Sequence, residues 1–198
     1  AERCARARAD LGLDAYRPTL LVSGGSQGAV AINEAVIVAR ERLLADGVQI
    51  LHVLGPKNIQ GATAVTDEST GASWLPVGYV DDMASAYAAA DLMMARSGAG
   101  TVVETATVGL PTIYVPLPHG NGEQARNATL AVDAGAGVVV ANADLDAERL
   151  LAETSRIHDT DALARMSAAG RGLMPAHAAE EMAVRVILAA RSIGPTTV

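Results

Sequence analysis

Hydrophobic and polar positions follow one another along the chain in blocks typical of strands alternating with helices. Short apolar runs rich in Val, Leu and Ile predict strands at residues 19–23, 49–54, 91–95, 112–115 and 137–140. Longer stretches between them favour helices at residues 29–45, 83–89, 101–108 and 123–133. This alternation predicts an α/β fold, a Rossmann-like parallel sheet with helices on both faces.

The two ends of the chain depart from this alternation. After residue 145 the pattern is purely helical, with helices expected at 146–157, 161–172 and 178–191. The opening AERCARARADLGL reads as the end of something already under way, so we expect a fragment of a longer protein. Segment 56–71 is the least regular and is expected to hold a strand edge or a mobile loop. The apolar residues Val184, Ile187 and Leu188 are interpreted as a stripe that faces the core, with an exposed surface as the alternative.

Composition narrows the classes of function. The 198 residues, 50% hydrophobic and 19% charged, suit one sizeable domain. A formal charge of -7 excludes a broad basic surface for nucleic acid or anionic lipid, so a phosphate has to be bound locally. The single cysteine, Cys4, excludes an internal disulfide and a Cys-cluster metal site and fits a cytoplasmic protein. No run of about 18 apolar residues and no signal peptide is evident.

The stretch LLVSGGSQGA, residues 20–29, joins the first predicted strand to a helix through a glycine-rich loop. Glycines let the backbone approach an anion, and the amides and dipole of a helix N-terminus favour its charge. The simpler interpretation is a tight turn in which Ser26 caps the helix. The spacing fits neither a Walker A loop nor the dinucleotide motif GxGxxG, which ranks a dinucleotide-binding oxidoreductase last.

A second glycine-containing helix start follows the strand at 91–95. Arg96 ends that strand, where a guanidinium needs an anion or a carboxylate partner. Residues Ala99, Gly100 and Thr101 open the helix, and two such termini on one sheet edge can share a diphosphate. Glu104, one turn on, suits a vicinal diol such as a ribose, while its simpler role is that of a capping partner.

A third loop, PLPHGNGEQ, brings Glu123 and Gln124 to a helix start, where an acid and an amide together suit sugar hydroxyls. The simpler interpretation is an ordinary acidic first turn, with His119 a solvated loop histidine. Of the paired aspartates in GYVDDM, Asp81 or Asp82 is interpreted as a helix N-cap, because no further ligands with metal spacing accompany them. No metal and no cofactor is predicted.

Together, LLVSGGSQGA, GYVDDMASAYAAADLMMARSGAGTVVE and PLPHGNGEQ resemble the C-terminal half of the MurG family, bacterial N-acetylglucosaminyltransferases that convert lipid I to lipid II in peptidoglycan synthesis. The resemblance runs from about residue 11 to 188 and implies one half of a GT-B fold. Residues 1–198 would then form the domain that binds UDP-N-acetylglucosamine, and the N-terminal acceptor domain would lie outside this chain. The chain would bind donor without transferring sugar, and the full-length enzyme would sit on the inner face of the plasma membrane.

The resemblance also implies roles for individual residues. The loop after the first strand and the second helix start would border the diphosphate, the segment at Val80 and Met83 would meet the uracil, and Glu104 would hold the ribose. Glu123 and Gln124 would contact the sugar, and Arg96 stands where related enzymes have a phosphate-contacting histidine. The implied donor-binding residues are Ser26, Gln27, Gly28, Val80, Met83, Arg96, Ala99, Gly100, Thr101, Glu104, Glu123 and Gln124.

Two positions depart from the family pattern. Glu123 stands where many members have Gln, which leaves the identity of the sugar open. Gly100 replaces a larger apolar residue, which is expected to loosen packing without removing an amide donor. The alternatives are a GT-B transferase acting on another acceptor, or a non-catalytic nucleotide-sugar-binding subunit.

Overall fold

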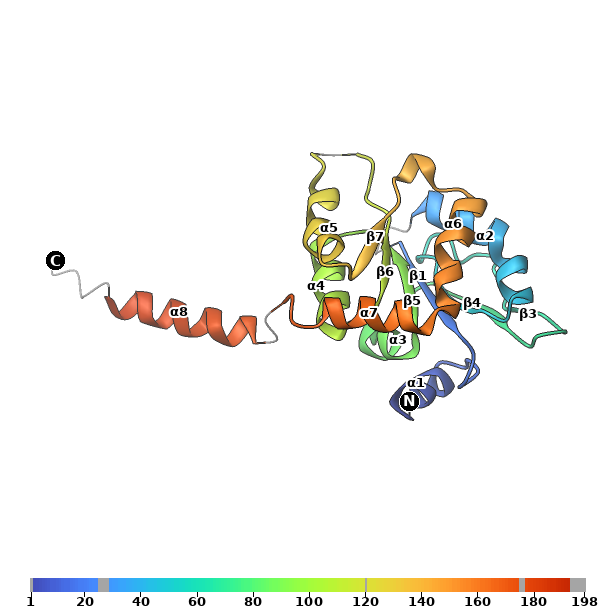
Figure 1. The fold of residues 1–198 in the computed structure, drawn as a ribbon, viewed down its shortest axis with the longest axis horizontal. Helices are drawn as coiled ribbons and strands as arrows, with labels where there is room; N and C mark the ends of the chain where they lie inside the picture. Colours follow the sequence, from blue (N-terminus) through green and yellow to red (C-terminus); the bar gives the residue numbers. More distant parts are fainter. Residues whose placement is uncertain (1, 25–28, 120, 175–176, 193–198) are drawn as a thin grey trace.

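The computed structural model describes residues 2–24, 29–119, 121–174 and 177–192 and contains a seven-stranded sheet (Figure 1). The strand order is β3-β4-β2-β1-β5-β6-β7, and all neighbours pair in parallel except β3 and β4. The strands are β1 (Thr19–Ser23), β2 (Gln49–Val53), β3 (Val65–Thr66), β4 (Ser73–Val77), β5 (Leu92–Ala95), β6 (Thr112–Tyr114) and β7 (Gly137–Val139).

Helices cover both faces of the sheet, as the alternating pattern predicts. Leu20 and Val22 of β1 pack in one core cluster with α2 and α6, whereas Leu21 packs in a second cluster with α3. The helices are α1 (Glu2–Asp10), α2 (Val30–Ala45), α3 (Met83–Ala89), α4 (Ala99–Val108), α5 (Glu123–Asp133), α6 (Ala147–Thr154), α7 (Thr160–Gly170) and α8 (Ala178–Ser192), with 3-10 turns η1 (Asn142–Asp144) and η2 (Ser155–His158).

The five predicted strands are confirmed to within a residue at each end, but β4 was not predicted. Its sequence SWLPV contains Pro76, which removes a backbone donor and argues against a strand inside a sheet. The structure accommodates this proline because β3 pairs only with Ser73 and Trp74, so the missing donor faces no partner strand. The strand edge expected within residues 56–71 is β3.

The strand order places a topological switch point between β1 and β5. From β1 the chain moves outward through β2 to β4, then returns to β5 on the other side of β1 and continues to β6 and β7. In open parallel sheets of this kind, ligands bind beyond the carboxyl ends of the strands at the switch point. The strand order therefore predicts a ligand-binding site at the loops after β1 and β5.

A buried histidine ties α2 to the sheet. The indole of Trp74 donates to Nδ1 of His52 at 3.2 Å, so the proton of the neutral imidazole lies on Nε2, which donates to Asn33 Oδ1 at 3.1 Å. Asn33, on α2, in turn donates to the carbonyl of Leu54 at the end of β2. Burial lowers the pKa of His52 to about 4, which keeps this network neutral.

A buried arginine anchors the first helix. Arg8 on α1 is 5% exposed, and its guanidinium donates to the carbonyl of Ala89 at 2.8 Å and to the carboxylate of Asp91 at 2.6 Å. Asp91 also accepts from the backbone amide of Thr19, the first residue of β1. The opening segment is thus part of the folded unit, packed against α3.

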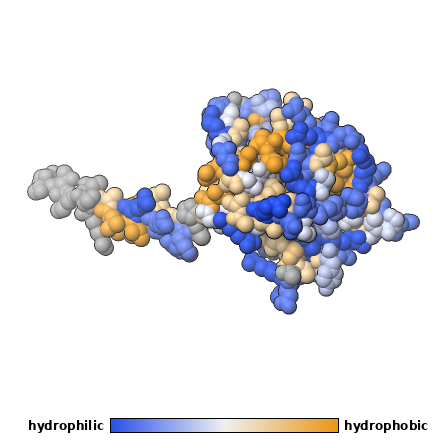
Figure 2. Space-filling model, viewed as in Figure 1, coloured by the Kyte–Doolittle hydropathy of each residue, from blue (hydrophilic) through white to orange (hydrophobic). Residues whose placement is uncertain are grey.

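The last helix corrects one expectation. Val184, Ile187 and Leu188 were interpreted as a core-facing stripe, yet each is at least half exposed. The helix α8 extends away from the sheet, and apolar side chains are visible on its surface (Figures 1 and 2). The amphipathic pattern predicts a buried face correctly only when a partner surface is present, and the described residues supply none.

Candidate functional site

Three loops meet at the carboxyl edge of the sheet around the switch point. Ser23 at the end of β1 lies opposite Ala95 of β5, and Ala95 lies opposite Tyr114 of β6. The glycine-rich loop, the loop beginning at Arg96 and the loop beginning at Val115 therefore leave neighbouring strands side by side. The sequence prediction that these motifs share one edge is confirmed.

The loop after β1 is described only at its two ends. Gly24 is buried, and Ser26, Gln27 and Gly28 lie outside the described residues. The first helical residue of α2 is Val30, and the N-cap position is Ala29, whose side chain makes no capping hydrogen bond. The simpler interpretation, in which Ser26 caps this helix, falls on a residue outside the described part of the chain.

The N-terminus of α4 opens toward the same edge. Its N-cap is Gly98, in extended backbone, and no side chain among the described residues caps the helix. Ala99, Gly100 and Thr101 occupy the first turn, where amides have no partner within the helix, and the first two are exposed. The preceding turn is held by Asn127 of α5, whose amide donates to the carbonyl of Ser97 at 3.1 Å. This is an anion-binding geometry.

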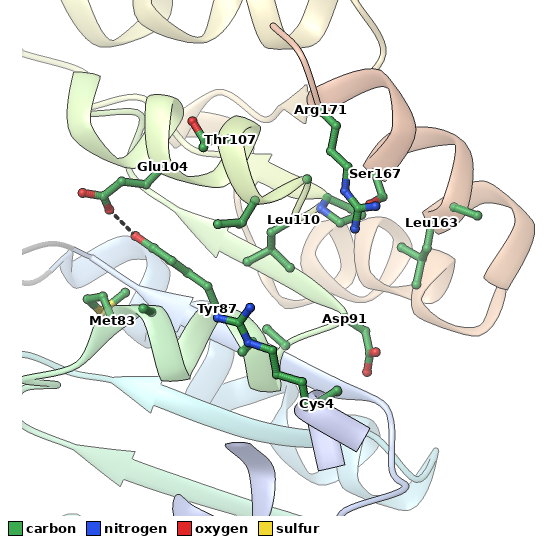
Figure 3. Close-up of a pocket in the computed structure, with 18 of the residues that line it drawn as sticks. Cys4, Met83, Tyr87, Asp91, Glu104, Thr107, Leu110, Leu163, Ser167 and Arg171 are labelled. Carbon is green, nitrogen blue, oxygen red and sulfur yellow. Dashed lines mark hydrogen bonds between the residues drawn. The ribbon is translucent and has the colours of Figure 1, made fainter. Parts of the chain in front are cut away.

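Glu104 projects from the second turn of α4 and meets α3. Its Oε2 accepts a hydrogen bond from the Tyr87 hydroxyl at 2.6 Å, so it is not a capping partner at its own helix N-terminus (Figure 3). The ring of Tyr87 is buried, and burial together with the neighbouring carboxylate raises the pKa of its hydroxyl. The tyrosine therefore stays protonated and donates.

Val80 and Met83 lie at the start of α3, half-buried against the core cluster on that face of the sheet. Asp82 is the N-cap of α3, accepting from the amides of Ala84 at 3.1 Å and Ser85 at 3.3 Å, which confirms the capping interpretation. The Ser85 hydroxyl also donates to Asp82, and this bond contributes most to lowering the pKa of the carboxyl, followed by the bonds from the amides.

Arg96 has a different partner from those expected. Its Nη1 donates to the carbonyls of Val115 and Pro116, both at 3.0 Å, so backbone oxygens at the end of β6 replace the expected anion or carboxylate. Burial lowers its pKa, and its Nε is buried with no hydrogen-bond partner among the described residues. Arg96 fixes the loop after β6 and places a positive charge at the carboxyl edge, beside the ends of β5 and β6.

In the loop after β6, one side chain of the Glu123–Gln124 pair already makes a hydrogen bond within the loop. Gln124 Oε1 accepts from the backbone amide of Leu117 at 2.9 Å, and Asn121 Oδ1 accepts from the amide of Glu123 at 3.1 Å. The side chain of Glu123 is exposed, as is that of His119. The loop therefore presents the Glu123 carboxylate and the Gln124 amide nitrogen at the carboxyl edge.

A cleft of about 1000 Å³ lies between α1, α3, α4 and α7 (Figure 3). Of the predicted site residues that the structure describes, Met83 and Glu104 line it, at the end nearest the carboxyl edge. Tyr87 also lines it and is the residue that sequence reasoning missed. The sequence indicates Tyr87 only by its residue type, a large aromatic residue with a polar hydroxyl in the alanine-rich helix α3.

The described residues contain neither a candidate metal-ligand group nor a candidate membrane-spanning helix. Among residues 2–24, 29–119, 121–174 and 177–192, no group of three or more His, Cys, Asp or Glu side chains is placed to hold a metal ion. Within the same residues, no helix is long and apolar enough to cross a membrane.

Comparison with known proteins gives a consistent result. Residues 19–183 match the model of the glycosyltransferase family 28 C-terminal domain. The chain is 90% identical over 196 residues to the UDP-N-acetylglucosamine--N-acetylmuramyl-(pentapeptide) pyrophosphoryl-undecaprenol N-acetylglucosamine transferase of Cutibacterium acnes, covering 99% of this chain and 53% of that protein. The equivalently named protein of a Nocardioides species is 48% identical over 189 residues, with 95% and 51% covered.

Solved structures agree on the fold. A crystal structure of MurG from Acinetobacter baumannii matches with a TM-score of 0.76 at 27% identity, covering 92% of this chain and 52% of that one. The calicheamicin glycosyltransferase CalG4 matches with a TM-score of 0.63 at 20% identity, over 88% and 45%, which speaks for the fold alone. The chain spans about half the length of the curated relatives it matches.

Proposed function

Because this chain belongs to the glycosyltransferase family 28 C-terminal domain family, we propose that it is the donor-binding half of a transferase that makes lipid II. The whole enzyme would move N-acetylglucosamine from UDP-N-acetylglucosamine to the 4-hydroxyl of undecaprenyl-pyrophosphoryl-N-acetylmuramoyl-pentapeptide. The printed name of the 90% identical relative supports this donor and this acceptor.

The observation that carries the proposal is that a carboxylate lies near the N-terminus of α4, which no side chain among the described residues caps, at the carboxyl edge of the sheet. The first turn of α4 offers amides to an anion, and Glu104, one turn further on, offers acceptors to neighbouring hydroxyls. A nucleoside diphosphate carries such an anion, its diphosphate, next to the neighbouring hydroxyls of its ribose. We assign the diphosphate to the amides of Ala99, Gly100 and Thr101, together with the loop of Ser26, Gln27 and Gly28.

The remaining donor contacts follow from the neighbouring loops. We assign the uracil to the backbone beside Val80 with Met83 against it, because that segment lies at the carboxyl edge and ends at a cleft shared with Glu104. We assign the sugar hydroxyls to Glu123 as acceptor and to the Gln124 amide nitrogen as donor, since Gln124 Oε1 is already bonded within its loop.

The chemistry would be an inverting displacement at the anomeric carbon. The acceptor hydroxyl attacks while UDP leaves, and negative charge grows on the diphosphate. Amides of the α4 N-terminus, already oriented, stabilise that charge without reorganising, and the guanidinium of Arg96 adds to the local positive potential. We propose that this suffices without a resident metal ion or cofactor.

The other half of the reaction is assigned to the remaining part of the enzyme. The relatives are about twice as long as this chain, and we propose that their other half holds lipid I, the general base and the contact with the inner face of the plasma membrane. On this proposal the 198 residues contain no catalytic residue and bind donor without turnover.

The test is a binding measurement on two matched carboxylate variants. Glu104→Gln is expected to weaken UDP-N-acetylglucosamine binding by about 1–3 kcal/mol, since a charged acceptor for the ribose hydroxyls is lost. Glu148→Gln, on α6 across the sheet, is the control and should bind as the wild type does. Equal affinity in all three proteins removes Glu104 from the site.

A further inference from the structure

The hydrogen bond between Tyr87 and Glu104 joins two helices across the mouth of a cleft. The hydroxyl oxygen of Tyr87 on α3 lies 2.6 Å from Oε2 of Glu104 on α4, and both residues line the cleft (Figure 3). We propose that Tyr87 is a positioning residue, which orients the Glu104 carboxylate toward the two hydroxyls of a ribose. This inference rests on the proposed function and adds to it the residue that sets the geometry of the ribose contact.

The tyrosine is well held. Tyr87 as a whole residue is 8% exposed, and it packs in the core cluster with Leu21 and Met93 of the central strands. The helix that carries it, α3, is capped at its N-terminus by Asp82. Burial of the residue holds its hydroxyl oxygen beside Oε2 of Glu104. Because a carboxylate only accepts, the tyrosine must be the donor of this bond.

The glutamate needs such a partner. Glu104 is exposed and has a long side chain, whose ordering on ligand binding costs free energy. With Oε2 held by Tyr87, Oε1 lies over the first turn of its own helix, 4.0 Å from the position that a Cβ at Gly100 would take. The unshared oxygen thus lies beside the helix turn to which the diphosphate is assigned, where the ribose joined to that diphosphate would follow.

A purely structural role is the competing explanation. In that case the bond only braces α3 against α4, and its loss would lower stability and weaken every nucleotide equally. A positioning role predicts that the loss falls on the ribose hydroxyls alone. The two explanations therefore differ in ligand selectivity, which can be measured.

The experiment measures dissociation constants of the chain for UDP and for 2′,3′-dideoxy-UDP by calorimetry. The wild type is expected to prefer UDP by about tenfold, the effect of a hydrogen bond to a charged group. Tyr87→Phe keeps the ring and is expected to weaken UDP about two- to tenfold while leaving 2′,3′-dideoxy-UDP unchanged, since only the ordering of Glu104 is lost.

Tyr114→Phe is the matched control. Tyr114 is also buried, and its hydroxyl bonds to Thr105 of the same helix α4 at 2.8 Å without touching Glu104. It is expected to lower thermal stability and to keep the wild-type preference for UDP. In a Glu104→Ala background, Tyr87→Phe should change neither affinity, because its effect passes through the carboxylate.

Distinct results overturn the inference and the proposed function. If Tyr87→Phe weakens both ligands equally, or weakens neither while Glu104→Ala abolishes the preference, Tyr87 does not position the carboxylate and the donor site still stands. If Tyr87→Phe keeps its effect in the Glu104→Ala background, the tyrosine acts by another route. If the wild type binds no UDP, the proposed function fails and this inference fails with it.

Discussion

The buried histidine makes stability depend on pH in a direction that follows from the structure. His52 is fully buried and neutral, with both ring nitrogens bonded, and its pKa is about 4 against 6.5 for an unconstrained histidine. Between pH 6.5 and 4, His52 therefore binds a proton in the unfolded chain but not in the folded chain. The stabilisation from neutral His52 is complete above pH 6.5 and is lost as pH falls toward 4.

The size of the effect follows from the two pKa values. One pKa unit corresponds to about 1.4 kcal/mol, so the histidine accounts for a loss of about 3 kcal/mol in the free energy of unfolding across that range. His52→Gln supplies an amide that can donate to Asn33 and accept from Trp74 but cannot titrate. Carboxylates contribute equally to both proteins, so the difference between them isolates the histidine.

The assay is urea unfolding of both proteins at half-unit steps from pH 7.5 to 4.5. The variant is expected to be less stable at pH 7.5 and to lose less stability on acidification, so that the two curves converge. His119→Gln, in an exposed loop outside this network, is the control and should follow the wild type. Parallel curves for wild type and His52→Gln would refute the assignment of a buried neutral imidazole.

Other substitutions test the packing that positions the site. Arg8→Met should lower the free energy of unfolding, measured in urea, by about 2–4 kcal/mol, because Asp91 loses a largely buried partner. Arg6→Met, which removes an exposed pair, is the control and should lower it by under about 1 kcal/mol. Similar losses in the two variants would refute the anchoring role of Arg8. Gly137→Ala should destabilise by about 1–3 kcal/mol, since its Cβ would lie 2.6 Å from the Thr112 carbonyl oxygen. Gly100→Ala meets only the edge of Glu104 at 4.0 Å and should raise stability by about 0.5–1 kcal/mol, and a fall would contradict that open environment.

The sequence predicted the fold well where hydrophobic periodicity alone decides it. The buried strands β1, β2, β5, β6 and β7 read as short apolar runs because helices cover both faces of the sheet. It failed at β4, where Pro76 is tolerated only because β3 is too short to reach it. The exposure of α8 was also missed, since an amphipathic pattern carries no information on whether a partner surface is present.

For the site, the sequence predicted which loops meet but not how their side chains are shared. Arg96 bonds to carbonyls of the neighbouring loop, and Gln124 gives one of its two polar atoms to the backbone of Leu117. The Tyr87–Glu104 bond joins residues 17 positions apart on different helices. Such contacts depend on how α3 and α4 sit on the sheet, which spacing along the chain does not encode.

The most direct test of the account is a calorimetric titration of this chain with UDP-N-acetylglucosamine, compared with UDP-glucose, ADP-glucose and NAD. A donor site of this kind predicts binding of the two uridine ligands, tighter for UDP-N-acetylglucosamine, and no binding of ADP-glucose or NAD. The affinity is expected to be modest, because ordering the loops costs free energy. Equal binding of ADP-glucose or NAD, or no binding of uridine ligands at millimolar concentration, would contradict a donor site at the switch point of this sheet.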